Sequence, residues 1–145
     1  MNARKWLVLA AMAACTVASA ASPKPSYAEA RKITNAVTST LSVVMLWDKR
    51  GDAERMQAIK AAMAVSNDAE RVFGADPFGP WRYCLQMANR HAGLVQALNE
   101  NGRKASRGDE IDPRKFYEAV AVAYNLGELY RSCRDQVETL DPPQK

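Results

Sequence analysis

Apolar residues recur at three- and four-residue steps in four stretches of the chain, and this spacing places them on one face of an α-helix. No stretch competes convincingly as a strand. The pattern therefore predicts an all-α fold, an antiparallel up-down bundle of about four helices. The expected buried faces are, in chain order, Ala30, Ile33, Val37, Leu41 and Val44; Met56, Ile59, Met63, Ser66 and Phe73; Trp81, Cys84, Leu85, Ala88, Ala92, Val95 and Leu98; and Phe116, Val120, Ala123, Leu126, Tyr130, Cys133 and Val137.

The first helix is expected to begin at Ser26, because Glu29 follows three residues later and the two can form a capping box. Gly51 should end this helix. Residues 37–44 are rich in Thr, Ser and Val, which are poor helix formers and also alternate tolerably as a strand. Whether this part of the segment is fully helical stays open.

The second helix is expected to run from a cap at Asp52 to a stop at Gly74. Pro80 suits the first turn of a third helix, where the N–H that proline lacks would have no partner in any case. The third helix should reach Asn101 and end at Gly102.

A long polar connection over residues 102–112, GRKASRGDEID, separates the third helix from the fourth. Asp112 and Pro113 should start the fourth helix as its cap and first residue. These two helices carry a series of small residues: Ala88, Ala92, Gly93, Ala119, Ala121, Ala123 and Gly127. The series allows either close backbone approach or a groove for a ligand or another helix, and the sequence leaves both open.

Two of the three cysteines are expected to pair, because Cys15 lies in an N-terminal leader and only Cys84 and Cys133 follow it. Measured from the connection between them, Cys84 lies about 26 Å down the third helix and Cys133 about 30 Å down the fourth, at a rise of about 1.5 Å per residue. These heights agree within one turn. A Cys84–Cys133 disulfide is therefore allowed, and an oxidising compartment favours it over two buried free thiols.

Residues 1–20 have the order of a secretory signal peptide: two basic residues, an uncharged apolar run and a small-x-small triplet that ends at Ala20. We expect cleavage after Ala20, which leaves one helical-bundle domain over residues 21–145 in the periplasm or secreted. No later segment is apolar enough to predict a membrane span. Two alternatives stay open, a retained N-terminal anchor and a lipoprotein modified at Cys15.

The charge of the chain bears on whether nucleic acid is a partner. The full sequence has 20 basic and 16 acidic residues, and removal of Arg4 and Lys5 with the leader leaves 18 basic against 16 acidic, a net charge of +2. A nearly balanced chain lacks the basic field that nucleic-acid binding requires. Nucleic acid is therefore not an expected partner.

Candidate catalytic chemistry is sparse. His91 is the single histidine, which disfavours catalytic triads and His-pair zinc sites, and no phosphate-binding loop or nucleophile elbow occurs. We therefore do not expect an enzyme. Met87 lies one helical turn before His91, so the alternative is a copper or b-type haem carrier that uses this pair, against the simpler interpretation of both as core residues.

The stretch FGPWRYC, residues 78–84, combines aromatic residues with an arginine, as protein interfaces do, although it could equally form an aromatic plug of the bundle. We expect an exported, non-catalytic protein-binding module. An immunity or inhibitor protein against a periplasm-acting enzyme is one concrete form, and the oligomeric state stays open. The expected contact residues lie at opposite poles of the bundle: Phe78, Trp81, Arg82 and Tyr83 at one, and Arg103, Lys104 and Arg107 at the other.

Overall fold

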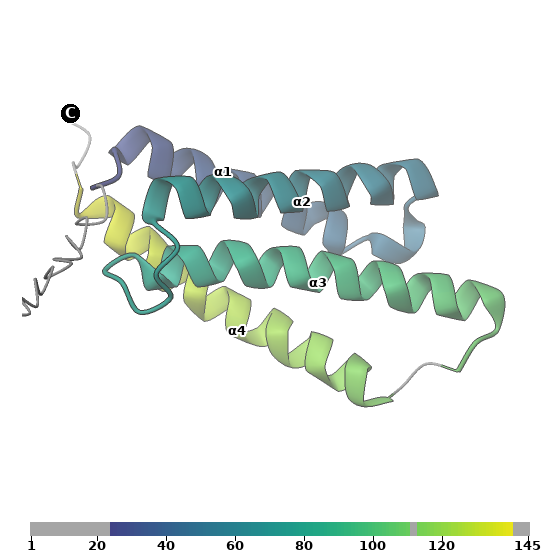
Figure 1. The fold of residues 1–145 in the computed structure, drawn as a ribbon. Helices are drawn as coiled ribbons and strands as arrows, with labels where there is room; N and C mark the ends of the chain where they lie inside the picture. The colour runs from purple at the N-terminus through teal and green to yellow at the C-terminus, as the bar shows by residue number, and fades with distance from the viewer. Residues whose placement is uncertain (1–23, 111–112, 141–145) are drawn as a thin grey trace, which may run out of the picture.

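The computed structural model describes residues 24–110 and 113–140 (Figure 1). Within these residues the regular structure is entirely helical: α1 (Tyr27–Val44), the short 3-10 helix η1 (Trp47–Lys49), α2 (Asp52–Phe73), α3 (Arg82–Arg107) and α4 (Pro113–Glu138). The predicted all-α fold of four helices is confirmed. The predicted signal peptide, its cleavage site, Cys15 and the Asp112 cap lie outside the described residues.

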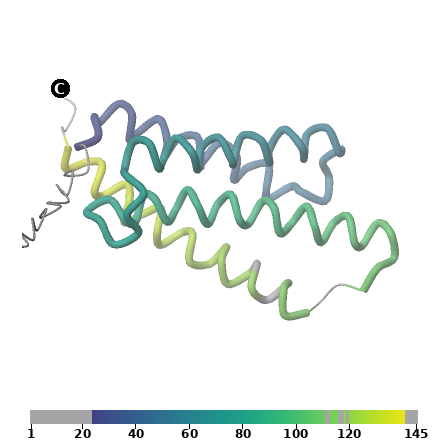
Figure 2. Tube along the Cα trace, in the orientation of Figure 1, coloured from purple at the N-terminus to yellow at the C-terminus, as the bar shows by residue number. Residues whose placement is uncertain are grey.

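The four helices run alternately up and down, each beside the next in sequence (Figures 1 and 2). One end of the bundle, called here the Phe78 pole, contains the start of α1, the end of α2, the start of α3 and the end of α4. The opposite end, called the far pole, contains η1, the start of α2, the end of α3 and the start of α4. No helix in the described part of the chain is long and apolar enough to cross a membrane.

Helix α1 begins as predicted, because the Ser26 hydroxyl oxygen accepts a bond from the Glu29 backbone N–H at 3.2 Å. Residues 37–44 are helical, and Thr and Ser hydroxyls along α1 donate to carbonyl oxygens three or four residues earlier, as Thr38 does to Thr34 at 3.0 Å. The prediction that α1 reaches Gly51 is wrong. The helix ends at Val44, and η1 follows, which buries Trp47 in the core.

Helix α2 buries only part of the predicted face: Phe73 is buried, and Ile59 and Ser66 are half-buried. Met56 and Met63 are 47% and 39% exposed, whereas the alanines Ala58, Ala62 and Ala69 are buried. Ala58 and Ala62 form a small core cluster with Trp47 and with residues of α3, so short side chains on α2 make room for the indole ring. Asp52 is the first helical residue, not the cap, and Gly51 is the cap. Gly74 ends α2 as predicted.

Helix α3 begins later and ends later than predicted. Pro80 lies in a turn, and α3 starts at Arg82, because the Trp81 carbonyl accepts the first helical bonds, from the Cys84 and Leu85 N–H groups. At its other end the helix passes through Gly102 and stops at Gly108, whose φ of 73° is the left-handed conformation that favours glycine. Arg103, Lys104 and Arg107 therefore lie in the last turns of α3 instead of in a loop, which corrects the expected connection. The predicted face of α3 is buried or half-buried.

Helix α4 packs along only part of its length. Leu126, Cys133 and Val137 are buried as predicted, but Val120 is 51% exposed and Ala123 is exposed. Figure 1 shows α4 diverging from α3 toward the far pole. The side chain of Phe116, also predicted on this face, lies outside the described part.

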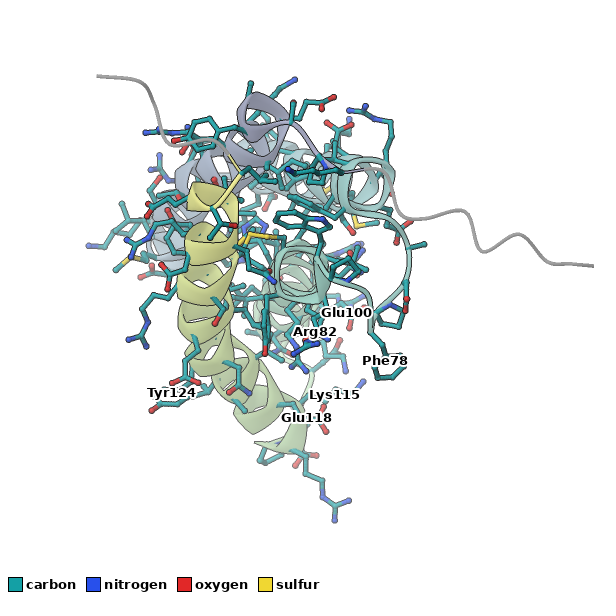
Figure 3. All side chains as sticks on the ribbon, turned by 90° about the vertical axis from the view of Figure 1, so that its left-hand side faces the viewer. Phe78, Arg82, Glu100, Lys115, Glu118 and Tyr124 are labelled. Atoms are coloured by element: carbon teal, nitrogen blue, oxygen red, sulfur yellow. A yellow bond between two sulfur atoms is a disulfide. The ribbon has the colours of Figure 1, made fainter. Side chains whose placement is uncertain are left out.

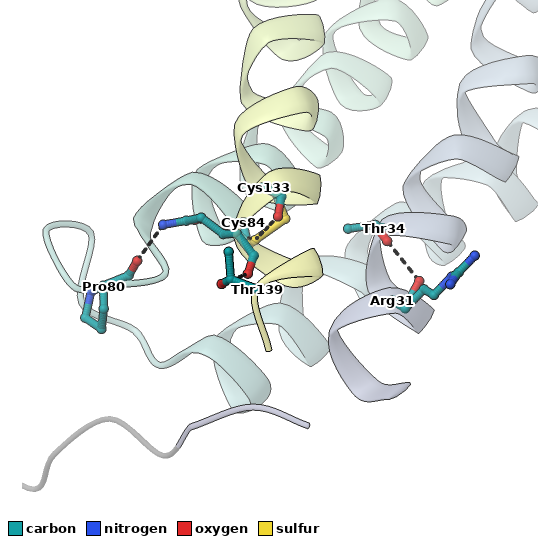
Figure 4. The surroundings of a disulfide bond; sticks show 7 residues. Arg31, Thr34, Pro80, Cys84, Cys133 and Thr139 are labelled. Atoms are coloured by element: carbon teal, nitrogen blue, oxygen red, sulfur yellow. Dashed lines mark hydrogen bonds between the residues drawn. A yellow bond between two sulfur atoms is a disulfide. The ribbon is translucent and has the colours of Figure 1, made fainter. Parts of the chain in front are cut away.

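A disulfide joins Cys84 at the start of α3 to Cys133 near the end of α4, with the two Cα atoms 4.6 Å apart (Figure 4). The predicted pairing is confirmed. This bond joins α3 to α4 at the Phe78 pole. At the far pole, the described parts of the two helices have no covalent cross-link.

Candidate functional site

The segment between α2 and α3, residues 74–81, is called here the Phe78 loop. Asp76 shapes its tip, because the Asp76 carboxylate accepts from the Phe78 N–H at 2.9 Å and the Asp76 carbonyl accepts from the Gly79 N–H at 3.1 Å. Gly79 is buried, and a Cβ there would lie 3.2 Å from the Asp76 carbonyl oxygen, so the turn has room only for glycine without adjustment.

Two glutamine side chains hold the Phe78 loop against the helices. Gln136 of α4 donates from Nε2 to the Pro80 carbonyl at 2.8 Å, and Gln86 of α3 donates to the Pro77 carbonyl at 3.3 Å. The Cys84–Cys133 disulfide lies directly beside this attachment (Figure 4). The loop is therefore fixed from both sides. Sequence reasoning missed these glutamines, because nothing in their spacing indicates a loop partner.

The aromatic residues of FGPWRYC divide into two environments. Trp81 is half-buried and stacks on Phe73, with ring centroids 6.0 Å apart, so it belongs to the aromatic plug. Phe78 is 85% exposed. Arg82 and Tyr83 form a pair at the surface. The Arg82 guanidinium lies 4.7 Å from the Tyr83 ring centroid and donates to the Tyr83 hydroxyl at 3.0 Å.

A groove of about 660 Å³ runs from the Phe78 loop along the surface between α3 and α4. It is called here the α3–α4 groove. Its lining is mainly apolar and includes Leu85, Gly93, Ala97 and Val122. Of the small residues noted in the sequence, Ala88 and Ala92 are instead buried in the core. Of that series, Gly93 lines the groove, whereas Ala88 and Ala92 serve close packing.

Charged residues stand at the edge of the α3–α4 groove. Arg90, Lys115 and Glu118 line it, and Figure 3 shows Lys115 and Glu118 on the same side of the molecule as Phe78. Tyr124, which is 77% exposed, lies on the other flank of α4 in the same view. Phe78 and the groove thus form one continuous face, and Tyr124 is an exposed aromatic residue outside it.

The basic residues of the far pole form a separate surface. Arg103, Lys104 and Arg107 line a shallow depression with Glu100, and Arg107 pairs with Asp109 at 3.2 Å. Cations in the last turns of α3 also interact favourably with the carbonyl groups at the end of the helix. The structure does not bring these residues near the Phe78 loop, since α3 separates the two sets by its length.

Met87 and His91 are both fully buried. The Thr40 hydroxyl donates to carbonyl oxygens of its own helix, so its oxygen accepts from His91 Nε2 at 2.8 Å, and this network assigns the proton to Nε2. Burial lowers the pKa of His91 to about 4. Among the described residues, no three His, Cys, Asp or Glu side chains gather in a way that could hold a metal ion. The copper or haem carrier stays a prediction, and no feature of this pair adds to it.

The fold and the site together define a disulfide-linked four-helix bundle that presents an exposed aromatic loop beside an apolar groove. Comparison with known proteins does not narrow this class: no family model, no curated protein and no solved structure matches the chain. A function must therefore be inferred from the surface of the molecule.

Proposed function

We propose that this chain is an exported, non-catalytic protein-binding module whose contact surface is the Phe78 loop together with the α3–α4 groove. An immunity or inhibitor protein that neutralises an enzyme acting in the periplasm is the concrete form that we favour. The observation that carries the proposal is Phe78, a large apolar side chain that is 85% exposed on a loop fixed by hydrogen bonds.

A fixed loop with an exposed aromatic residue suits binding for an energetic reason. Transfer of a phenylalanine side chain from water into a partner's pocket is worth roughly 1.5–3 kcal/mol. Ordering a flexible loop would consume part of that gain, but the Phe78 loop is already held by Gln86 and Gln136. Pre-ordered aromatic anchors of this kind are typical of the residues that dominate binding energy at interfaces.

Two further features support the exported part of the proposal. The order of residues in the leader is that of a signal peptide. The Cys84–Cys133 disulfide is compatible with an oxidising compartment, because such bonds persist outside the reducing cytosol.

The test compares Phe78→Ala with Tyr124→Ala, which removes another exposed aromatic residue, from the other flank of α4. Each protein is immobilised and used to capture periplasmic proteins, which are quantified by mass spectrometry. We expect Phe78→Ala to lose a specific partner that wild type and Tyr124→Ala both retain. Because Phe78 contacts little of its own molecule, its replacement should change the free energy of unfolding by less than about 0.5 kcal/mol.

The captured partner then decides the form of the function. An immunity or inhibitor protein should suppress the activity of a captured enzyme at a one-to-one ratio, and Phe78→Ala should release that inhibition. Arg103→Glu tests the other predicted contact surface, at the far pole, and loss of capture by this variant alone would contradict the proposal. Equal capture by Phe78→Ala and wild type would show that the contact surface lies elsewhere.

A further inference from the structure

A second opening, called here the far-pole cleft, lies where α4 diverges from the other helices. It has a volume of about 670 Å³, within the range of small-molecule sites. Leu94 and Leu98 of α3 and Val44 of α1 supply apolar walls, and Met45 and Val120 stand at its edge. Met45 is 82% exposed and Val120 is 51% exposed, so apolar surface that the fold leaves uncovered gathers here.

The indole of Trp47 lines this cleft and carries an unused hydrogen-bond donor. Trp47 is only 7% exposed, and its Nε1 has no hydrogen-bond partner among the described residues. A buried N–H without an acceptor is unfavourable and uncommon in folded proteins. An acceptor supplied from outside the chain would remove this penalty.

The guanidinium of Arg55 is held beside the indole. Its Nε donates to the Trp47 carbonyl at 3.1 Å, Nη2 donates to the Asp48 carbonyl at 3.4 Å, and the group lies 6.0 Å from the Trp47 ring centroid. Nη1 has a weaker engagement, because its nearest carboxylate, that of Asp52, is 3.9 Å away on a side chain that is 99% exposed. Arg55 is therefore oriented by backbone groups while Nη1 keeps the capacity to bind an anion.

Gly102 lies next to both the Trp47 indole nitrogen and the Arg55 guanidinium. A Cβ built on this residue would lie 3.8 Å from Trp47 Nε1 and 3.8 Å from Arg55 Nη1. Gly102 lines the cleft and lies inside α3, where alanine would be the more favourable residue for the helix. The position of the missing side chain thus lies within contact distance of both the indole nitrogen and a guanidinium nitrogen.

We propose that the far-pole cleft binds an apolar carboxylic acid. The tail would lie against the apolar walls of Leu94, Leu98 and Val120, and the carboxylate would accept from Trp47 Nε1 and Arg55 Nη1. A singly charged head group fits better than a phosphate, because Asp48 also lines the cleft and would repel a second negative charge. This site is distinct from the Phe78 loop, and neither proposal depends on the other.

Calorimetric titration of the folded, disulfide-intact protein with decanoate below its micelle concentration tests the site, and decanol serves as the uncharged analogue. We expect one decanoate to bind and decanol to bind at least about ten-fold more weakly, because it lacks the charge-assisted bonds. In nuclear magnetic resonance spectra, the indole N–H signal of Trp47 should shift downfield as decanoate binds, and Trp47→Phe assigns that signal.

Gly102→Ala is the decisive variant, because its Cβ occupies the space between the two donors without a steric clash. It should weaken decanoate binding at least about ten-fold while the protein remains as stable as wild type or becomes more stable. Gly127→Ala in α4 is the matched control, since its Cβ also meets nothing within 4 Å and Gly127 lines neither this cleft nor the α3–α4 groove. Arg55→Met should abolish the preference for decanoate over decanol.

Three results would overturn the proposal: no binding of decanoate, equal affinity for decanol, or equal binding by Gly102→Ala and Gly127→Ala. Failure of decanoate to bind would leave the capture experiment with Phe78→Ala unaffected. The two proposals can therefore be rejected separately.

Discussion

At the scale of single residues, His91 is a titratable side chain that the fold removes from water. Its ring is fully buried, Nε2 is bonded to Thr40, and Nδ1 has no partner among the described residues. Desolvation accounts for the lowered pKa, and no carboxylate of the described residues compensates a positive charge there. The neutral ring is compatible with the core, whereas the imidazolium is not.

This burial predicts a loss of stability in mild acid. An ordinary histidine has a pKa of 6.5, whereas burial lowers the pKa of His91 to about 4 in the folded protein. Below pH 6.5 the unfolded chain therefore binds a proton that the folded chain does not. Stability therefore falls as pH drops from about 6.5 to about 4, by roughly 3 kcal/mol in total from this group. His91→Gln keeps a donor for Thr40 but does not titrate, so it should lack this component.

Urea unfolding of both proteins across this pH range measures the effect. The free energy of unfolding of wild type should decrease by roughly 3 kcal/mol more than that of His91→Gln between about pH 7 and about pH 4. Carboxylates affect both proteins alike and cancel in the difference. Parallel pH profiles would show that His91 titrates normally in the folded state.

The exposure of single side chains at the candidate site could not be predicted from the sequence. FGPWRYC includes the loop that carries the exposed Phe78, but its sequence does not distinguish Phe78 from Trp81, because both are large aromatic residues beside a helix start. Their exposure differs because Phe73, distant by only a loop, offers a stacking partner to Trp81 and none to Phe78. That choice depends on the Asp76 turn and its glutamine contacts, which involve residues far apart in the chain.

At the scale of elements, the helices themselves were predictable, and their buried faces and ends less so. Cap residues and apolar spacing identify all four helices, as at Ser26 and Gly74. On α2 the sequence predicts that Met56 and Met63 are buried. In the structure the neighbouring alanines are buried instead, because tight packing around Trp47 requires small side chains. Gly102 and Gly108 are both potential helix stops, and only tertiary contacts decide between them.

Helix α4 has two halves that should differ in stability. Residues 126–137 include the buried Leu126, the disulfide-bonded Cys133 and the buried Val137, whereas residues 120–125 expose Val120 and Tyr124. Local opening is easiest where few buried contacts must break. Backbone amides of residues 120–125 should therefore exchange hydrogen at least about ten-fold faster than those of residues 126–137.

Hydrogen exchange followed by mass spectrometry checks this expectation, and α3 supplies an internal reference. Amides beside Leu94 and Val95, which are buried at the same level of the bundle on α3, should remain protected. Uniform protection along α4 would contradict the packing described here. Addition of decanoate should slow exchange in residues 120–125 if the far-pole cleft is occupied.

At the scale of the whole molecule, the two poles are held in different ways. The Phe78 pole combines the disulfide, the clamped loop and the Phe73–Trp81 stack. The far pole has instead a cleft beside the diverging start of α4. The constraints other than ordinary helix packing are therefore concentrated at the Phe78 pole.

Removal of that bond should be costly. Cys84 and Cys133 are separated by 49 residues, and closing a loop of this length reduces the entropy of the unfolded chain enough to stabilise the fold by about 4 kcal/mol. The double variant Cys84→Ala/Cys133→Ala should lose about this much free energy of unfolding in urea. Wild type under reducing conditions should lose a similar amount. Two titratable thiols in the denatured, unreduced wild type would contradict the pairing.

The placement of the described chain ends, close to Phe78, has a practical outcome. The described part of the chain begins and ends at the same pole as the Phe78 loop, so an affinity tag, a carrier protein or a lipid attached directly beside either of these ends would crowd that loop (Figure 1). Coupling to a solid support through Asp109, an exposed residue at the opposite end, would instead turn the loop toward the solution. Immobilisation by a terminal tag could hide a genuine partner, and the orientation of the bait belongs in the design of any capture assay.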